Sequence, residues 1–252
     1  PDTLFVFEKF DLAFNILEVI EGQFILNEIE ASNGFVNLEI NKKGVENYLL
    51  FVSNPDDSSA FSLNLKKVKL DAVTAGYNDL RDSDAFKIYF VSAVANGSFT
   101  DSEIHSALYG DIIVKELKLE NTNYLTNEKA NVDIGIGIDL ESGAFQISRG
   151  FLTLRENYKF EVKGKTNAKK FHYTFDAKNL KINKAKTLIP QKHLNNFQDY
   201  LIEGDLNVFL EIKRDEGREK PSVSGDFDVK RGSFTYMKTG QAVKITTLNG
   251  TF

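Results

Sequence analysis

Hydrophobic and polar residues alternate along most of this chain. Between residues 158 and 163, Tyr158, Phe160 and Val162 are separated by charged residues. The same two-residue period recurs at residues 36–40, 61–65, 171–176 and 206–212. Successive side chains of a β-strand point to opposite faces of a sheet, so each segment predicts a strand with one apolar face. Because the whole chain has four prolines, most backbone N–H groups can take part in a sheet.

Helix patterns are confined to two short stretches. Residues 190–204 carry Leu194, Phe197 and Leu201 at helical spacing before a glycine, which predicts about two or three helical turns. Residues 101–108 predict one more short helix. Polar, turn-forming segments separate the predicted strands, at residues 33–34, 41–44 and 214–217. The pattern therefore predicts a mainly β protein with antiparallel strands and one or two short helices.

The tripeptide Gly-x-Phe occurs six times, at residues 22–24, 97–99, 143–145, 225–227, 232–234 and 250–252. Glycine permits a positive φ or a bulge at the start of a strand, and the phenylalanine two residues later points to the same face. The irregular spacing disfavours a solenoid with a fixed period. The motif fits a meander of strand-turn-strand units and equally fits ordinary turns that lead into core phenylalanines.

Composition narrows the class of protein. A chain of 252 residues with 42% hydrophobic and 27% charged residues is expected to fold around a sizeable core. The net charge of -5 argues against a nucleic-acid partner, and the absence of cysteine excludes disulfides and Cys-ligated metals. No apolar run approaches the length of about 18 residues that a membrane span needs, and no signal peptide opens the chain. Because the chain begins at Pro1 and its only methionine is Met237, we expect a fragment of a longer protein with any anchor upstream.

Candidate catalytic and metal sites are weak. His105, His172 and His193 lack metal-binding spacing, and no nucleophile elbow or phosphate loop occurs. The acidic residues at 79–84 lack the glycine and the distal glutamate of a calcium loop and predict a hairpin turn. Two glycosylation sequons also match turn chemistry and are interpreted as turns, at residues 96–98 and 249–251. We therefore predict no enzyme, no catalytic residue, no metal and no cofactor.

Charge is unevenly distributed. Residues 155–192 contain 11 Lys or Arg and 3 Asp or Glu, a balance of +8 that leaves -13 for the rest of the chain. This stretch could meet anionic lipid headgroups. The favoured interpretation is that its lysines solvate the outer faces of strands and discourage edge pairing.

The order of elements carries a resemblance to a known family. Towards the C-terminus, a short helical segment and Glu203-Gly204 precede the strand at 206–212, followed by Gly232-Ser-Phe-Thr-Tyr236 and Leu248-Asn-Gly-Thr-Phe252. Matching patches upstream are residues 22–48 and 61–77. Together these patches span most of the chain and resemble AsmA-like proteins, which are related to TamB and to the bridge-like lipid transfer proteins.

The resemblance implies a location and a role. AsmA-like proteins are anchored in the bacterial inner membrane by an N-terminal helix, extend into the periplasm and are implicated in carrying phospholipid toward the outer membrane. Residues 1–252 are then expected to be a single β-rich periplasmic segment of such a protein. Its expected partners are phospholipid acyl chains and proteins of the cell envelope.

The apolar strand faces suggest how such a segment would work. They must be covered by a second sheet, a helix or a ligand. If an elongated antiparallel sheet curls into an open groove or half-barrel, acyl chains can cover its apolar face. The aromatic residues predicted to line this groove are Phe160, Phe171, Tyr173, Phe175, Phe227 and Phe234. The same residues could instead fill a closed β-sandwich, a scaffold that binds protein partners through its edges.

Overall fold

The computed structural model describes residues 3–21, 24–47, 61–62, 65–81, 83–100, 102–119, 122–155, 157–167, 170–185, 195, 198–217 and 221–251. The chain divides into two compact units, Pro1–Glu141 (unit 1) and Ser142–Phe252 (unit 2).

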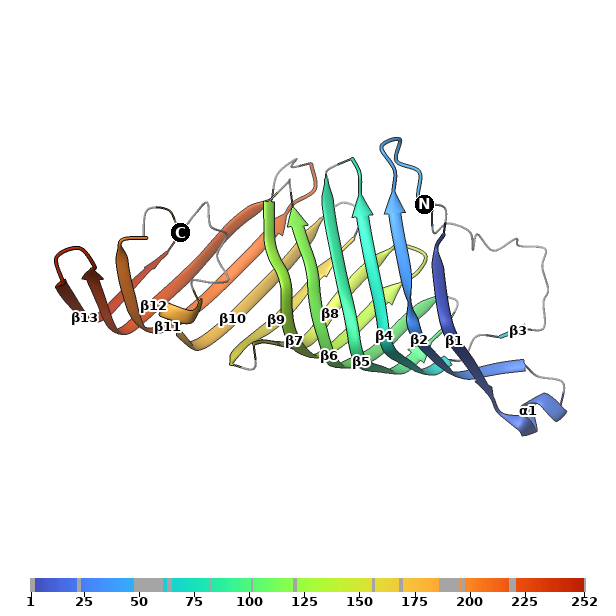
Figure 1. The fold of residues 1–252 in the computed structure, drawn as a ribbon. Coiled ribbons are helices and arrows are strands. Elements are labelled where there is room, and N and C mark those ends of the chain that lie inside the picture. The colour runs from blue at the N-terminus through green and yellow to red at the C-terminus, as the bar shows by residue number, and fades with distance from the viewer. Residues whose placement is uncertain are drawn as a thin grey trace. The chain divides into compact units, whose positions relative to one another are not determined.

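Unit 1 is a sheet of long strands (Figure 1). In spatial order the strands are β1 (Phe5–Phe14), β2 (Phe24–Ile40), β4 (Leu65–Asp79), β5 (Asp84–Phe99), β6 (Glu103–Leu119) and β7 (Thr122–Asp139). Neighbours pair antiparallel, except that β2 and β4 pair parallel through a crossover between residues 41 and 64. The short strand β3 (Phe61–Ser62) also pairs parallel with β2, and the helix α1 (Ile16–Ile20) connects β1 to β2.

Unit 2 is an antiparallel meander (Figure 1). Its strands follow one another in space as in sequence: β8 (Ala144–Leu154), β9 (Tyr158–Thr166), β10 (Phe171–Lys181), β11 (Tyr200–Arg214), β12 (Ser222–Tyr236) and β13 (Gln241–Thr251). The short helix α2 (Ile182–Ala185) follows β10 directly and contacts β10 and β11.

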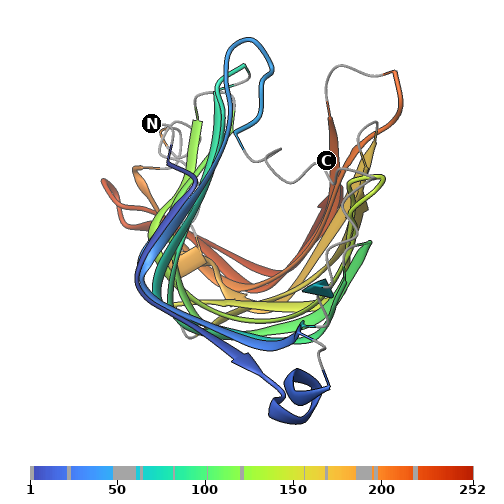
Figure 2. The same cartoon turned by 90° about the vertical axis from the view of Figure 1, so that its right-hand side faces the viewer.

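The strands of each unit bend along their length, so each sheet has a concave and a convex side (Figure 2). Left-handed residues stand side by side in neighbouring strands. In unit 1, Asn33 (φ 51°) lies opposite Ala72 (φ 52°). In unit 2, Asn179, Gly204 and Arg231 have positive φ in β10, β11 and β12. Such residues interrupt regular pleating, bend a strand and increase its twist, so they are a local source of the curl.

The expectation of a mainly β, curled sheet with one or two short helices is confirmed. The helix predicted at residues 101–108 is wrong, and the one predicted at residues 190–204 is contradicted at its C-terminal end. Residues 103–108 belong to β6, because Ile104 and Leu108 share a strand face with Ile112 and pair with β7. Leu201 belongs to β11, while Leu194 and Phe197 lie outside the described residues.

Several predicted turns also lie within strands. Residues 33–34 are part of β2, and the two sequons at 96–98 and 249–251 are part of β5 and β13. Asparagine tolerates the left-handed conformation without ending a strand, as Asn33 shows. The predicted turns at 41–44 and 214–217 do follow strand ends, with Gly44 and Gly217 at positive φ.

The Gly-x-Phe motif has no single structural role. Gly143 has a positive φ of 65°, as expected for a turn glycine. Gly97, Gly232 and Gly250 lie inside strands without a positive φ. At Gly97 the reason is close approach of β6, because an added Cβ would lie 1.9 Å from the backbone carbonyl oxygen of His105. Gly22 and Phe252 lie outside the described residues.

Candidate functional site: an uncovered apolar face

The register of unit 2 places all six candidate aromatic residues on one side of its sheet, here called the unit 2 apolar face. Residues paired directly on neighbouring strands point to the same side. One row of such pairs runs from β9 to β12 through Phe160, Ala177, Val208 and Phe227. The other candidates lie in further rows of this side: Phe175 with Leu210, Tyr173 with Ile212, Phe171 with Arg214, and Phe234 with Ile202. Whether these side chains line a lipid site stays a prediction.

Unit 1 has an apolar face of the same kind, which the candidate residues chosen from the sequence did not include. Its rows cross all six long strands, for example Leu12, Ile29, Val68, Ala95, Leu108 and Ile134. On β1, the rings of Phe5 and Phe7 stack at 5.9 Å between centroids, and those of Phe7 and Phe10 at 5.6 Å. The alternation of Phe5 with Phe7, and of Phe10 with Leu12, is the sequence signal for this face.

No second layer covers either apolar face within the part of the chain that the structure describes. Extensive contacts join neighbouring strands, and the other substantial contacts between described elements are those of α1, α2 and β3 with strands. Nevertheless Val73 and Ala177, in the middle of the two sheets, are each only 1% exposed. Side chains of neighbouring strands therefore bury one another in the middle of each sheet, and the described strands form no closed sandwich.

The outer strands of the sheets leave apolar side chains in solvent. On β1, Phe5 is 52% and Phe10 is 49% exposed, and on β13 Val243 is 63% exposed. A soluble protein rarely leaves large contiguous apolar surface in water without a partner for it.

The opposite faces carry charge. In unit 1, Lys69 of β4 bridges to Glu28 of β2 at 2.5 Å, and this hydrogen bond lowers the pKa of Glu28. In unit 2, Lys163 lies 2.6 Å from Glu161 on the same strand and lowers its pKa in the same way. These pairs are partly exposed to solvent, and each contributes little to stability. The two faces of each sheet thus differ sharply in polarity.

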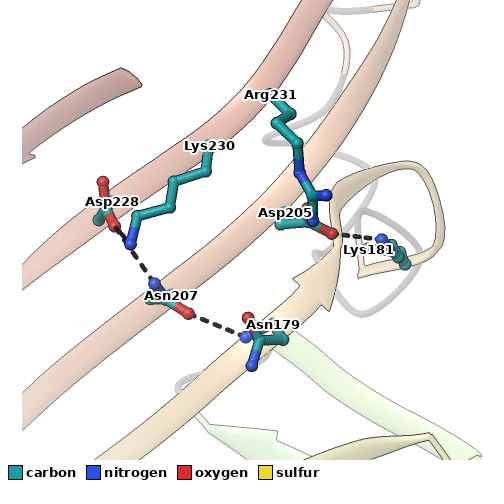
Figure 3. Close-up of polar contacts among 7 residues, drawn as sticks. All are labelled: Asn179, Lys181, Asp205, Asn207, Asp228, Lys230 and Arg231. Atoms are coloured by element: carbon teal, nitrogen blue, oxygen red, sulfur yellow. Dashed lines mark hydrogen bonds and ion pairs between the residues drawn. The ribbon is translucent and has the colours of Figure 1, made fainter. Parts of the chain in front are cut away.

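One polar cluster on the charged face of unit 2 is more enclosed (Figure 3). The side chain of Asp205 is 9% exposed and pairs with both Lys181 and Arg231. Hydrogen bonds from these two cations lower the pKa of Asp205. Beside them, the Asn207 side-chain amide donates to Asp228 at 3.2 Å, and the Asn179 backbone N–H donates to the Asn207 side chain at 2.9 Å. The cluster links β10, β11 and β12 at their three left-handed residues.

Tyr173 is a titratable residue near the centre of the unit 2 apolar face. Burial raises the pKa of its phenol, so it stays neutral throughout the physiological range. The face accordingly presents uncharged surface along its centre.

The other residues considered from the sequence do not assemble a reactive centre. His172 lies on the charged face, 2.7 Å from Glu211, and His105 lies 3.1 Å from Glu103. Asp79 is buried and accepts two hydrogen bonds from the Arg81 guanidinium at 2.9 and 2.6 Å. His193 and Asp82 lie outside the described residues. Within the described ranges, no group of three or more His, Asp or Glu side chains could hold a metal ion.

Helices of the described chain are all too short to cross a membrane.

Similarity to known proteins does not identify the function of this chain. No protein-family model matches the chain, and neither curated proteins nor solved structures yield a similar protein. The family resemblance is therefore carried by the sequence patches alone.

Chemically, an uncovered apolar face on a sheet whose other face is charged can hold the hydrocarbon part of an amphipathic molecule. Burial of each methylene group is favourable by about 0.8 kcal/mol.

Proposed function

We propose that the apolar faces of this protein bind lipid acyl chains. One observation supports the proposal: these faces are apolar across successive strands and have no covering layer in the described residues. A face of this extent needs a partner in water, and hydrocarbon chains fit it because they require no hydrogen bonds. Acyl chains would be buried on the enclosed inner rows of each face and would enter from solvent at the outer strands.

The biological setting that we propose rests on the resemblance to AsmA-like proteins. In that setting the chain is a periplasmic segment of a protein anchored in the inner membrane, and it binds or conducts phospholipid toward the outer membrane. The curled single sheet supports this proposal because it matches the shape that an acyl-chain conduit requires. No catalytic residue takes part in the proposed function.

The second candidate is a non-catalytic interaction module of the cell envelope. It is favoured by the exposed hydrophobic side chains of β1 and β13, the outer strands of the two sheets. Unpaired strand edges can accept a strand from a partner protein. In this alternative the apolar faces are closed by a partner rather than by lipid.

The test is native mass spectrometry of the protein expressed in bacteria and purified without detergent. Bound phospholipid is expected in the wild type and should be lost in Tyr173→Asp, because a carboxylate on the apolar face must be desolvated by an acyl chain. The matched control is Thr174→Asp, which adds the same charge one residue away on the charged face.

Circular dichroism should show that both variants remain folded. Phospholipid bound equally by the wild type and by folded Tyr173→Asp would contradict lipid binding on this face. A folded, lipid-free wild type that co-purifies with a strand-donating protein would favour the interaction module instead.

A further inference from the structure

Arg214 is the one charged residue that strand register assigns to the unit 2 apolar face among the described residues. It pairs with Phe171 of β10, so both side chains point to the side that carries Tyr173 and Phe175. It also continues the apolar phase of β11, where Leu210 and Ile212 precede it at two-residue spacing. A cation in this phase interrupts the apolar pattern only at its end, because β11 ends at Arg214.

An aromatic ring contacts the side chain of Arg214 at this end of the face. Its guanidinium lies 5.2 Å from the centre of the Phe171 ring, a cation–π contact. No carboxylate within the described ranges forms an ion pair with it, although Asp215 and Glu216 follow in the exposed turn. By contrast, neighbouring Lys213 points to the charged face and lies 3.3 Å from Glu211.

The chemistry of this position matches one class of ligand. A guanidinium can donate two parallel hydrogen bonds to a phosphate and keeps its charge at every physiological pH. From Phe171 to Ala177 the apolar face extends about 20 Å along β10, at about 3.3 Å per residue. An acyl chain lying along these rows would bring a polar head at its end to Arg214.

Building on the proposed lipid binding, we propose that Arg214 is the headgroup site of the unit 2 apolar face and selects lipids that carry a phosphate. The acyl chain lies over Tyr173 and Phe175, and the headgroup phosphate accepts hydrogen bonds from the Arg214 guanidinium. Phe171 positions that guanidinium through its ring.

The test compares two single-chain lipids that share a lauroyl tail and differ in the phosphate: lauroyl lysophosphatidylglycerol and monolauroylglycerol. Calorimetric titration of the whole chain below their critical micelle concentrations should give about tenfold tighter binding of the phosphate-bearing lipid. Arg214→Gln should remove this preference and leave binding of monolauroylglycerol unchanged. Lys213→Gln, which removes the same charge on the opposite face, should keep the preference.

The outcomes separate this inference from the proposed function. If the wild type binds neither lipid, the proposed function fails. If both bind but Arg214→Gln keeps the full preference, or loses both lipids while folded, the headgroup site is overturned. Inorganic phosphate at the concentration of the lipid should not displace lauroyl lysophosphatidylglycerol. Displacement would assign Arg214 to free phosphate and overturn the lipid headgroup.

Discussion

The ring of Tyr173 in β10 lies directly over Gly164 in β9. The two residues pair across the strands, and a Cβ added to Gly164 would lie 2.2 Å from Cδ1 of that ring. The same arrangement occurs at the pair of Phe227 and Gly250, where the nearest ring atoms would lie 2.8 Å away. An aromatic ring thus fills the space above a glycine on the apolar face, and the glycine lets the ring lie flat against the sheet.

We expect Gly164→Ala to lower the free energy of unfolding by about 1–3 kcal/mol, because the Tyr173 ring and the adjacent backbone would have to shift. Urea denaturation followed by circular dichroism measures this change. Gly137→Ala is the matched control, since its Cβ would meet nothing closer than 3.4 Å, at His105. Equal costs for the two variants would show that the contact with Tyr173 does not decide the effect.

Replacing alanine by glycine should have opposite effects on stability at two sites in β4, of which one is left-handed and the other is not. Ala72 has a φ of 52°, where glycine is less strained than alanine, so Ala72→Gly should raise the free energy of unfolding by about 0.5 kcal/mol. Ala75 lies in the same strand without a positive φ, and Ala75→Gly should lower it by about 0.5–1 kcal/mol.

Both variants are measured by urea denaturation under the same conditions. A decrease of similar size at both positions would contradict the role of a left-handed residue at Ala72. Ala72→Val adds a further check, because a β-branched residue at positive φ should cost more than the alanine it replaces.

Local alternation was enough to predict much of this fold. The strand at residues 158–163 and the strand at 206–212 follow the two-residue period, and their apolar residues do share one face. Prediction failed where the phase changes within a strand. In β2, Ile29 and Ala31 share a face with Val36 only because Asn33 is left-handed between them. An Asn-Gly pair fits a hairpin turn equally well, and pairing with β1 and β4, which are distant in sequence, favours the strand.

The candidate site was predictable only in part. The phases of Phe171, Tyr173 and Phe175 follow from their own strand, so their common orientation could be read locally. The lack of a covering layer among the described residues could not be predicted from the sequence, because layer packing depends on contacts between distant segments. The position of Arg214 could be predicted from its phase with Ile212. The enclosure of Asp205 could not, because it depends on β10 and β12 pairing with opposite edges of β11.

The enclosed carboxylate of Asp205 predicts a pH-dependent contribution to stability. Lys181 and Arg231 hold its folded-state pKa below the value of about 3.9 that an aspartate has in an unfolded chain. The ionised carboxylate therefore stabilises the folded state above about pH 4, and this contribution is lost as the pH falls through the folded-state pKa. Asp205→Asn removes the ionisable group, leaves two cations beside a neutral amide and should be less stable than the wild type at pH 7.

The measurement is the difference in the free energy of unfolding between wild type and Asp205→Asn, from urea titrations at pH 7, 5, 4 and 3. The difference should be constant from pH 7 to 5 and shrink below about pH 4, where the wild type also loses its charge. Asp226→Asn is the control, because Asp226 lies exposed on the same face, in β12. Its difference from the wild type should stay small at every pH. A difference for Asp205→Asn that does not change between pH 7 and pH 3 would mean that the charge of Asp205 does not stabilise the three joined strands.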